Sequence, residues 1–255
     1  MALITLTTDF GLEDWFVGTM KGVIASIAPD AQVVDITHGI EPGDIMGGAF
    51  VLGASTRFFP EGTIHMAVVD PGVGSARGAV VARVRGHTFV APDNGLLSLV
   101  VPEDGGAEVR IHRVQNDQFF LHPVSRTFHG RDVFAPVAAH LSCGVALGEV
   151  GPPVDAIVRY PLPCPRETEA GLEGEVVYVD RFGNAITSIA ESRRSCTQVM
   201  LDNGATIAVA ACYADAGLGR PVAVFGSSGF LEIAINGGNA ARVLDLHRGV
   251  RVVAR

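Results

Sequence analysis

Lysine is almost absent from the sequence: Lys21 is the single one among 255 residues, and the formal net charge is −8. A broad nucleic-acid-binding surface needs clustered lysine and arginine, so this class of partner is excluded. Any recognition of an anion must use arginine, backbone amides or hydroxyl groups.

The cysteines are also few and widely spaced, without a C-x-x-C pair; they are Cys143, Cys164, Cys196 and Cys212. This spacing argues against a zinc site and against a disulfide framework.

Long apolar runs are missing too. No run approaches the roughly 18 residues that a membrane-spanning helix needs. The first apolar stretch, 3–7, leads directly into the acidic Asp9, which is not the pattern of a signal peptide. We therefore expect no membrane segment and a protein of the reducing cytoplasm.

Motifs for metal ligation are absent as well. There is no H-E-x-x-H, and Asp9, His38 and Asp70 would form an oxygen-rich set without a supporting motif. We expect no metal site and no cofactor.

What the sequence does contain is apolar residues, 48% of the chain, in a strand–helix alternation over its first half. Strands are predicted at 3–7, 31–38 ("AQVVDITH") and 63–70 ("TIHMAVVD"). Helices are predicted between them, one from a cap at Asp14 to about Ala28 and one from a cap at Asp44 through Phe58. This order predicts an α/β domain with a mostly parallel sheet and flanking helices. Ligands of such sheets bind at the carboxyl ends of the strands, where Asp9, Thr37, His38 and Asp70 fall.

The amino-acid composition of the chain changes after about residue 150. Residues 151–167 are rich in proline and predict a linker between a domain over 1–150 and a second domain over 168–255. The second domain contains short β-branched runs separated by glycine and asparagine, with no convincing helix. It predicts a small all-β, barrel-like domain.

The loop in "MAVVDPGVGSARGAVVARV", 66–84, has glycines after a buried strand, as a nucleotide-binding loop does. However, the third glycine position of G-x-G-x-x-G is Arg77, and "AVVARVRG" alternates like a strand where the fingerprint needs a helix. A phosphate cradle is therefore excluded. The loop is either an ordinary Asp70-Pro71-Gly72 turn or part of a site.

Other strand ends favour the site. "TTDFG" places Asp9 at the first, and "SRTFHGRDVFAP" places His129 before a helix that Arg131 and Asp132 start, with Asp132 as its cap. Ionisable groups that converge on one end of a sheet form a physically grounded site hypothesis.

Polar breaks also interrupt the strands of the second domain. "DRFGN" has Asp180, Phe182 and Asn184 within five residues, and Ser227 and Ser228 stand between two glycines. Each break is consistent with a hairpin turn. An amide beside an exposed aromatic ring also suits a purine, which stacks on the ring and pairs with the amide.

Five blocks together closely resemble the S-adenosyl-L-methionine hydroxide adenosyltransferases, relatives of the fluorinase and chlorinase. They are "TTDFG", "VVDPGVGSARG", "TFHGRDVFAP", "DRFGNAITSI" and "SSGFLEIA", in the expected order between residue 3 and about 241. The resemblance implies an α/β domain, a C-terminal β-barrel and a homotrimer with active sites between subunits. It also implies that S-adenosyl-L-methionine and water give adenosine and methionine without a metal.

The resemblance also assigns roles. It makes Asp70, Arg77 and His129 the catalytic set and Asp9 the carboxylate that binds the ribose hydroxyls. It implies that Asp180 and Ser227 contact the methionine end of the substrate and that Asn184 contacts the adenine edge. Phe128, Phe182 and Tyr213 would contact the adenine ring. A departure from the family pattern is "INGGNA" after the serine pair, which bears on backbone contacts to adenine.

The expected chemistry is hydrolytic attack at C5′. A hydroxide that attacks a sulfonium loses charge in the transition state, so a dry pocket favours the reaction, and water needs a base beside it. Three alternatives remain open: a halide-using adenosyltransferase, which would lack a carboxylate at position 70; a sensor that binds S-adenosyl-L-methionine or adenosine without turnover; and a calcium-dependent nucleoside hydrolase, suggested by "TTDFGLED".

Overall fold

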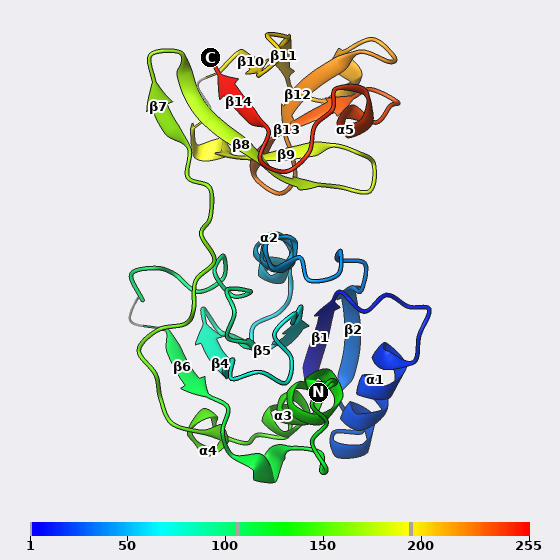
Figure 1. The fold of residues 1–255 in the computed structure, drawn as a ribbon, viewed down its shortest axis with the longest axis vertical. Coiled ribbons are helices and arrows are strands. Elements are labelled where there is room, and N and C mark those ends of the chain that lie inside the picture. Colours follow the sequence, from blue (N-terminus) through cyan, green and yellow to red (C-terminus); the bar gives the residue numbers. More distant parts are fainter. Residues whose placement is uncertain (1, 106–107, 194–195) are drawn as a thin grey trace. The chain divides into compact units, whose positions relative to one another are not determined.

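A computed structural model describes residues 2–105, 108–193 and 196–255. The chain divides into two compact units, Met1–Tyr160 and Pro161–Arg255. The division falls inside the proline-rich segment. Figure 1 shows the ribbon of both units.

The first unit is built on a six-stranded mixed sheet with the strand order β2-β1-β3-β5-β4-β6. The first four strands in this order are parallel, and β4 and β6 join as antiparallel strands. The predicted α/β class is confirmed. The strands are β1 (Leu3–Thr8), β2 (Gln32–Thr37), β3 (Ile64–Val68), β4 (Ala79–Val84), β5 (His87–Pro92) and β6 (Arg110–Arg113).

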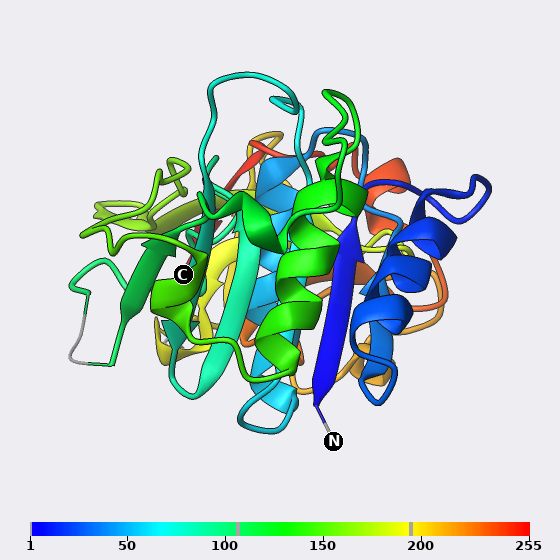
Figure 2. The same ribbon diagram turned by 90° about the horizontal axis from the view of Figure 1, so that it is seen from below.

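Helices cover both faces of this sheet (Figure 2). One face packs against α1 and α3 through a core that includes Ile4 and Met66, and the other packs against α2 through a core that includes Leu52 and Ala67. The helical elements are α1 (Phe16–Ile27), α2 (Ile45–Ser55), α3 (Ala135–Ser142), α4 (Leu147–Val150), the π-helical turn η3 (Gly130–Phe134), and the 3-10 turns η1 (Thr56–Phe58) and η2 (Asp117–Phe119).

Only one of the three predicted helix caps is present. The side chain of Asp44 accepts a hydrogen bond from the amide of Gly47 at 2.9 Å and so caps α2. The prediction for Asp14 is wrong, because α1 begins at Phe16 without a side-chain cap. The prediction for Asp132 is also wrong: this residue lies fully buried inside η3.

The second unit is a closed β-barrel, which confirms the predicted class. The sheet order is β14-β10-β11-β12-β13-β9-β8-β7, and the pairing of β14 with β8 closes it, with β7 outside the ring. A four-residue helix, α5 (Ala240–Val243), was not expected. The strands are β7 (Arg166–Thr168), β8 (Gly171–Val179), β9 (Ala185–Ala190), β10 (Gln198–Leu201), β11 (Thr206–Ala210), β12 (Pro221–Phe225), β13 (Phe230–Ile235) and β14 (Arg251–Ala254), with the 3-10 turns η4 (Glu191–Arg193) and η5 (Tyr213–Asp215).

The barrel has its own apolar interior, which includes the fully buried Val176, Ile189, Leu231 and Val252. It therefore meets the requirement for an independently packed unit. In the described part of the chain, no helix has the length and apolar character to cross a membrane.

Candidate active site

Three neighbouring parallel strands end at one edge of the sheet of the first unit. Asp9 directly follows β1, His38 directly follows β2, and Asp70 lies two residues beyond β3. Because β2, β1 and β3 are adjacent and parallel, their carboxyl ends lie side by side. Arg77 precedes β4, which runs antiparallel to β5, so the loop from Asp70 returns to the same edge.

Asp70 and Arg77 form a buried ion pair. Nε of Arg77 lies 2.9 Å from both carboxylate oxygens of Asp70, and Nη2 also donates to Oδ2. The side chains are only 4% and 12% exposed, so water screens the pair weakly. The guanidinium lies over the ring of Phe134, 5.1 Å from its centroid, which fixes its plane.

His129 completes this arrangement from the segment before η3. Nη2 of Arg77 lies 2.9 Å from Nδ1 of His129. Because a guanidinium has no acceptor, Nδ1 must be the acceptor and the neutral ring carries its proton on Nε2. Burial, and next the positive charge of Arg77, lower the pKa of His129 below its ordinary value, which keeps the imidazole neutral.

A close approach of two loops sets this geometry. Gly74 has a φ of +75°, and a Cβ at this position would lie 2.1 Å from the carbonyl oxygen of Arg126. The loop that carries Arg77 can therefore lie against the segment that leads to His129 only because residue 74 is glycine.

An aromatic pocket of about 140 Å³ adjoins the ion pair. Phe128, a predicted ring contact, is in its lining together with Phe10 and Phe16. The three rings pack with centroids 5.0–5.9 Å apart. Asp70 and His129 are the titratable groups of the lining. The pocket is thus apolar apart from one charged edge, as a small-ligand site is.

Asp9 lies at the same edge, half-buried. Its Oδ2 accepts a hydrogen bond from the amide of Gly43 at 2.7 Å. Burial raises the pKa of Asp9 above its ordinary value, and the negative charge of Asp70 acts in the same direction. Asp9 is therefore a carboxylate held by backbone amides, those of Gly43 and of Asp9 itself, with acceptor capacity left for a ligand hydroxyl.

The barrel carries the other predicted residues. Asp180 closes the turn between β8 and β9: its Oδ1 accepts from the amides of Phe182 and Asn184 at 2.8 and 2.9 Å, and its Oδ2 accepts from Nδ2 of Asn184 at 2.9 Å. The ring of Phe182 is 75% exposed at the tip of this turn. A large aromatic ring held open to solvent on a well-bonded turn is typical of a contact surface.

Tyr213 is hydrogen-bonded to the buried carboxylate of Glu232, which was not predicted as a site residue. Its hydroxyl donates to Oε1 of Glu232 at 2.5 Å, and Glu232 is 5% exposed. Burial, and next this hydrogen bond, raise the pKa of Tyr213, so the phenol stays protonated. Ser227 lies exposed in the turn between β12 and β13.

The structure thus brings five predicted residues together in the first unit: Asp9, Asp70, Arg77, Phe128 and His129. The other five lie on the barrel: Asp180, Phe182, Asn184, Tyr213 and Ser227. Phe10, Phe16 and Phe134 were missed, although Phe10 and Phe134 stand inside the quoted blocks "TTDFG" and "TFHGRDVFAP". Phe10 carried a local signal, because it directly follows Asp9, whereas Phe16 and Phe134 are adjacent to none of the predicted residues.

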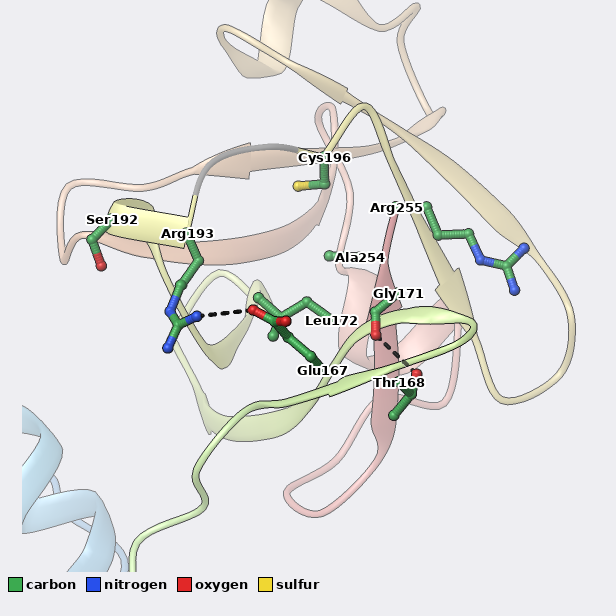
Figure 3. A pocket seen from close by; sticks show the side chains of 9 residues that line it. All are labelled: Glu167, Thr168, Gly171, Leu172, Ser192, Arg193, Cys196, Ala254 and Arg255. Carbon is green, nitrogen blue, oxygen red and sulfur yellow. Dashed lines mark hydrogen bonds and ion pairs between the residues drawn. The ribbon is translucent and has the colours of Figure 1, made fainter.

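A wider pocket of about 590 Å³ lies on the barrel and contains none of the ten predicted residues (Figure 3). Several of its polar side chains already have partners: Nη1 of Arg193 lies 3.2 Å from Glu167, and the hydroxyl of Thr168 donates to the carbonyl of Gly171. Across the described residues, no group of three or more His, Cys, Asp or Glu is placed to hold a metal ion.

Fold and site together define a two-unit protein, an α/β unit followed by a β-barrel, with a carboxylate–guanidinium–imidazole set beside an aromatic pocket. The family model for the SAM hydroxide adenosyltransferase N-terminal domain matches residues 4–151, and that for the C-terminal domain matches residues 174–253. The chain belongs to this family.

Relatives support this assignment over the full length. The (R)-S-adenosyl-L-methionine hydrolase of Thermus thermophilus is 41% identical over 259 residues, which cover 99% of each chain. A fluorinase of an Actinoplanes species is 30% identical, covering 98% of this chain and 96% of its own. A crystal structure of an uncharacterized conserved protein from Thermotoga maritima matches with a TM-score of 0.91 and 38% identity, covering 99% of this chain and all of that one.

Proposed function

We propose that this protein hydrolyses S-adenosyl-L-methionine at C5′ of the ribose and releases adenosine and methionine. The observation that carries the proposal is the buried Asp70 carboxylate, held by Arg77 and facing the aromatic pocket together with His129. The family and the named relatives support the substrate.

The reaction is a displacement by water. The water oxygen forms a bond to C5′, the C5′–S bond breaks, and its electron pair goes to sulfur, which becomes the neutral thioether of methionine. One proton must leave the water. Because positive and negative charge disappear together, an apolar pocket that excludes bulk water favours the transition state.

Asp70 is the better placed proton acceptor. His129 already uses its Nδ1 lone pair to accept from Arg77, so it could take up a proton there only by losing that hydrogen bond. Asp70 keeps further lone pairs on its oxygens, and Arg77 holds them in a fixed direction. Asp70 orients and deprotonates the water, Arg77 holds the carboxylate, and His129 holds Arg77.

The substrate contacts follow from the remaining residues. Asp9 accepts from the ribose hydroxyls, Asn184 pairs with the adenine edge, and Phe128, Phe182 and Tyr213 contact the ring. Asp180 and Ser227 bind the amino-acid end of the methionine. The step uses side chains and water, so we propose that no metal or cofactor takes part.

We also propose a homotrimer, with each site completed by the α/β unit of one subunit and the barrel of its neighbour. The family resemblance suggests this arrangement. The exposed rings of Trp15, 70% exposed on the first unit, and Phe182, on the second, support it as surfaces that association would cover. We further propose that the protein works in a reducing cytoplasm, which the free thiols of Cys143, Cys164 and Cys212 support.

Incubation of the purified protein with S-adenosyl-L-methionine tests the activity. We expect adenosine and methionine in equal amounts, at a rate that a metal chelator leaves unchanged. A parallel reaction with chloride tests the fluorinase-like alternative. Formation of 5′-chloro-5′-deoxyadenosine in place of adenosine, or tight binding without any product, would contradict the proposal.

A further inference from the structure

His38 has no role in the proposed reaction, yet its surroundings are unusually well defined. It is 4% exposed, at the end of β2, beside the turn that carries Asp9. Nδ1 of His38 lies 2.7 Å from the hydroxyl of Thr8, and Nε2 lies 3.2 Å from Oδ1 of Asp35. The amino group of Lys21 lies 2.6 Å from the other oxygen of Asp35.

The direction of these contacts follows from their chemistry. The Asp35 carboxylate next to Nε2 favours a proton on that nitrogen, which leaves Nδ1 as an acceptor. The Thr8 hydroxyl then donates to His38, and its oxygen accepts from the amide of Phe10 at 3.2 Å. The side chain of His38 thereby fixes the backbone on both sides of Asp9.

The main chain of the same segment adds two more bonds. The carbonyl of His38 accepts from the amide of Gly11 at 2.8 Å, and the amide of Gly43 donates to the carboxylate of Asp9 at 2.7 Å. The segment 38–43 therefore contacts Thr8 before Asp9, Gly11 after Asp9, and the carboxylate of Asp9 itself.

From this arrangement we propose that His38 is a positioning residue, which holds the Asp9 carboxylate in the direction needed to bind the ribose 2′ and 3′ hydroxyls. This inference rests on the proposed role of Asp9. It predicts that loss of His38 weakens recognition of the diol specifically, because a carboxylate that accepts two hydroxyls needs a fixed orientation.

The chain offers a matched control at the other buried histidine of the same sheet. Nδ1 of His65 lies 2.7 Å from the hydroxyl of Thr5, also on β1, and His65 is fully buried. Thr5 lies in the middle of β1, away from the Asp9 turn. Loss of His65 therefore removes an equivalent buried contact without touching Asp9.

The readout is the ratio of two dissociation constants, for 2′,3′-dideoxyadenosine and for adenosine, measured by calorimetry on the full-length protein. A pair of hydrogen bonds to a carboxylate predicts a ratio of about 10 or more in the unmodified protein. Asp9→Asn should bring it to within about threefold of unity, since the charge-assisted part of the bonding is lost. His38→Ala should lower the ratio at least threefold, to roughly the same range.

Two further variants separate positioning from folding. His38→Asn keeps an amide group near the Nδ1 position and should restore most of the ratio. Thr8→Val keeps the shape of the side chain but removes the hydroxyl, so it should lower the ratio even if His38→Ala does not fold. The controls His65→Ala and Thr5→Val should lower the melting temperature while leaving the ratio unchanged.

The outcomes distinguish the two proposals. One outcome is that Asp9→Asn brings the ratio of dissociation constants close to one while Thr8→Val and a folded His38→Ala leave it unchanged. In that case the positioning role of His38 is wrong and the role of Asp9 stands. If Asp9→Asn itself leaves the ratio unchanged, the ribose contact proposed for Asp9 is wrong, and the inference about His38 is overturned with it.

Discussion

At the scale of single residues, Asp70 has two functions that one substitution separates. Its backbone forms a turn, since the amide of Val73 donates to the carbonyl of Asp70, and its carboxylate binds Arg77. Asp70→Asn keeps the turn, because asparagine suits it equally well. It removes the charge that would take the proton from water. We expect the single-turnover rate of adenosine release to fall roughly 10²–10⁴-fold, with little change in affinity for S-adenosyl-L-methionine.

The control for this prediction is Asn184→Ala on the barrel. It should mainly raise KM, because the adenine contact proposed for Asn184 would be equal in the ground and transition states. If Asp70→Asn stays within a few-fold of the unmodified rate, Asp70 is a turn residue only and the proposed mechanism is wrong.

His129 gives a prediction about pH. Its pKa is lowered in the folded protein, so as the pH falls the unfolded chain takes up a proton first. The free energy of unfolding contributed by His129 is therefore constant above its unfolded pKa of about 6.5 and decreases as the pH falls below that value. In His129→Asn this contribution is absent, because asparagine does not titrate.

Denaturant unfolding of both proteins from pH 8 to pH 5 measures the difference. Plotted against pH, the free energies of unfolding of the unmodified protein and of His129→Asn should run parallel above about pH 6.5 and converge or cross below it. A difference that grows as the pH falls, in favour of the unmodified protein, would contradict a neutral His129 beside Arg77.

The residues of the site were partly predictable from sequence. Asp70, Arg77 and His129 could be singled out because several ionisable groups converge at one end of the sheet and because the motifs around them resemble those of a known family. Phe134 beneath Arg77 could not, because an aromatic residue in an apolar run reads as ordinary core. Asp132 was misread for a related reason: a carboxylate near a helix start usually caps it, yet here it accepts from the amide of Ser125 at 2.7 Å and from Arg131.

At the scale of elements, the loop between β3 and β4 depends on the contact of Gly74 with the Arg126 carbonyl. Gly74→Ala would place a Cβ 2.1 Å from that oxygen, so the loop must move away from the segment before His129. We expect this variant to lose most of its kcat because Arg77 and His129 separate, and positioning errors of this size are costly.

Gly62→Ala is the matched control, since Gly62 has a similar φ of +85° but nothing within 4 Å of the added Cβ. It carries the backbone strain alone, on the order of 1 kcal/mol of stability. Equal activity in the two variants would show that the close contact at Gly74 does not set the geometry of the site.

Elements were predicted where hydrophobic periodicity is strong. The alternation in 79–84 correctly excluded a nucleotide-binding helix, because β4 is a strand. Helix starts were less predictable. Asp14 precedes α1 by two residues and caps nothing, because sequence identifies a capping residue type but not the backbone turn that brings it to the first amides.

At the scale of the whole molecule, a site shared between subunits can be tested by mixing two defects. Asp70→Asn damages the α/β unit and Asn184→Ala damages the barrel. In mixed trimers with random composition, about one quarter of the shared sites would combine an intact unit of each kind. Co-expressed variants carrying different tags should therefore regain activity at low substrate concentration.

Light scattering on the mixed sample supplies the control, because it measures whether trimers are present. Mixed trimers with no more activity than the two variants measured separately would place each site within one chain. A fully active monomer would reject the trimer altogether.

The sequence predicts a second domain because a proline-rich segment and short β-branched runs differ in composition from the strand–helix alternation before them. How the α/β unit of one subunit and the barrel of another would complete a site, as proposed, is a property of assembly. No local pattern encodes it, since the residues that meet across an interface share neither a strand nor a turn.

Attack of water on C5′ of S-adenosyl-L-methionine can be tested by turnover in water enriched in ¹⁸O, with mass spectrometry of the products. We expect adenosine with one ¹⁸O at its 5′ oxygen and methionine without label. Labelled methanol or labelled homoserine would show attack at one of the other two carbons on sulfur, and unlabelled adenosine would show that water is not the nucleophile; either result would mean that the proposed reaction is wrong.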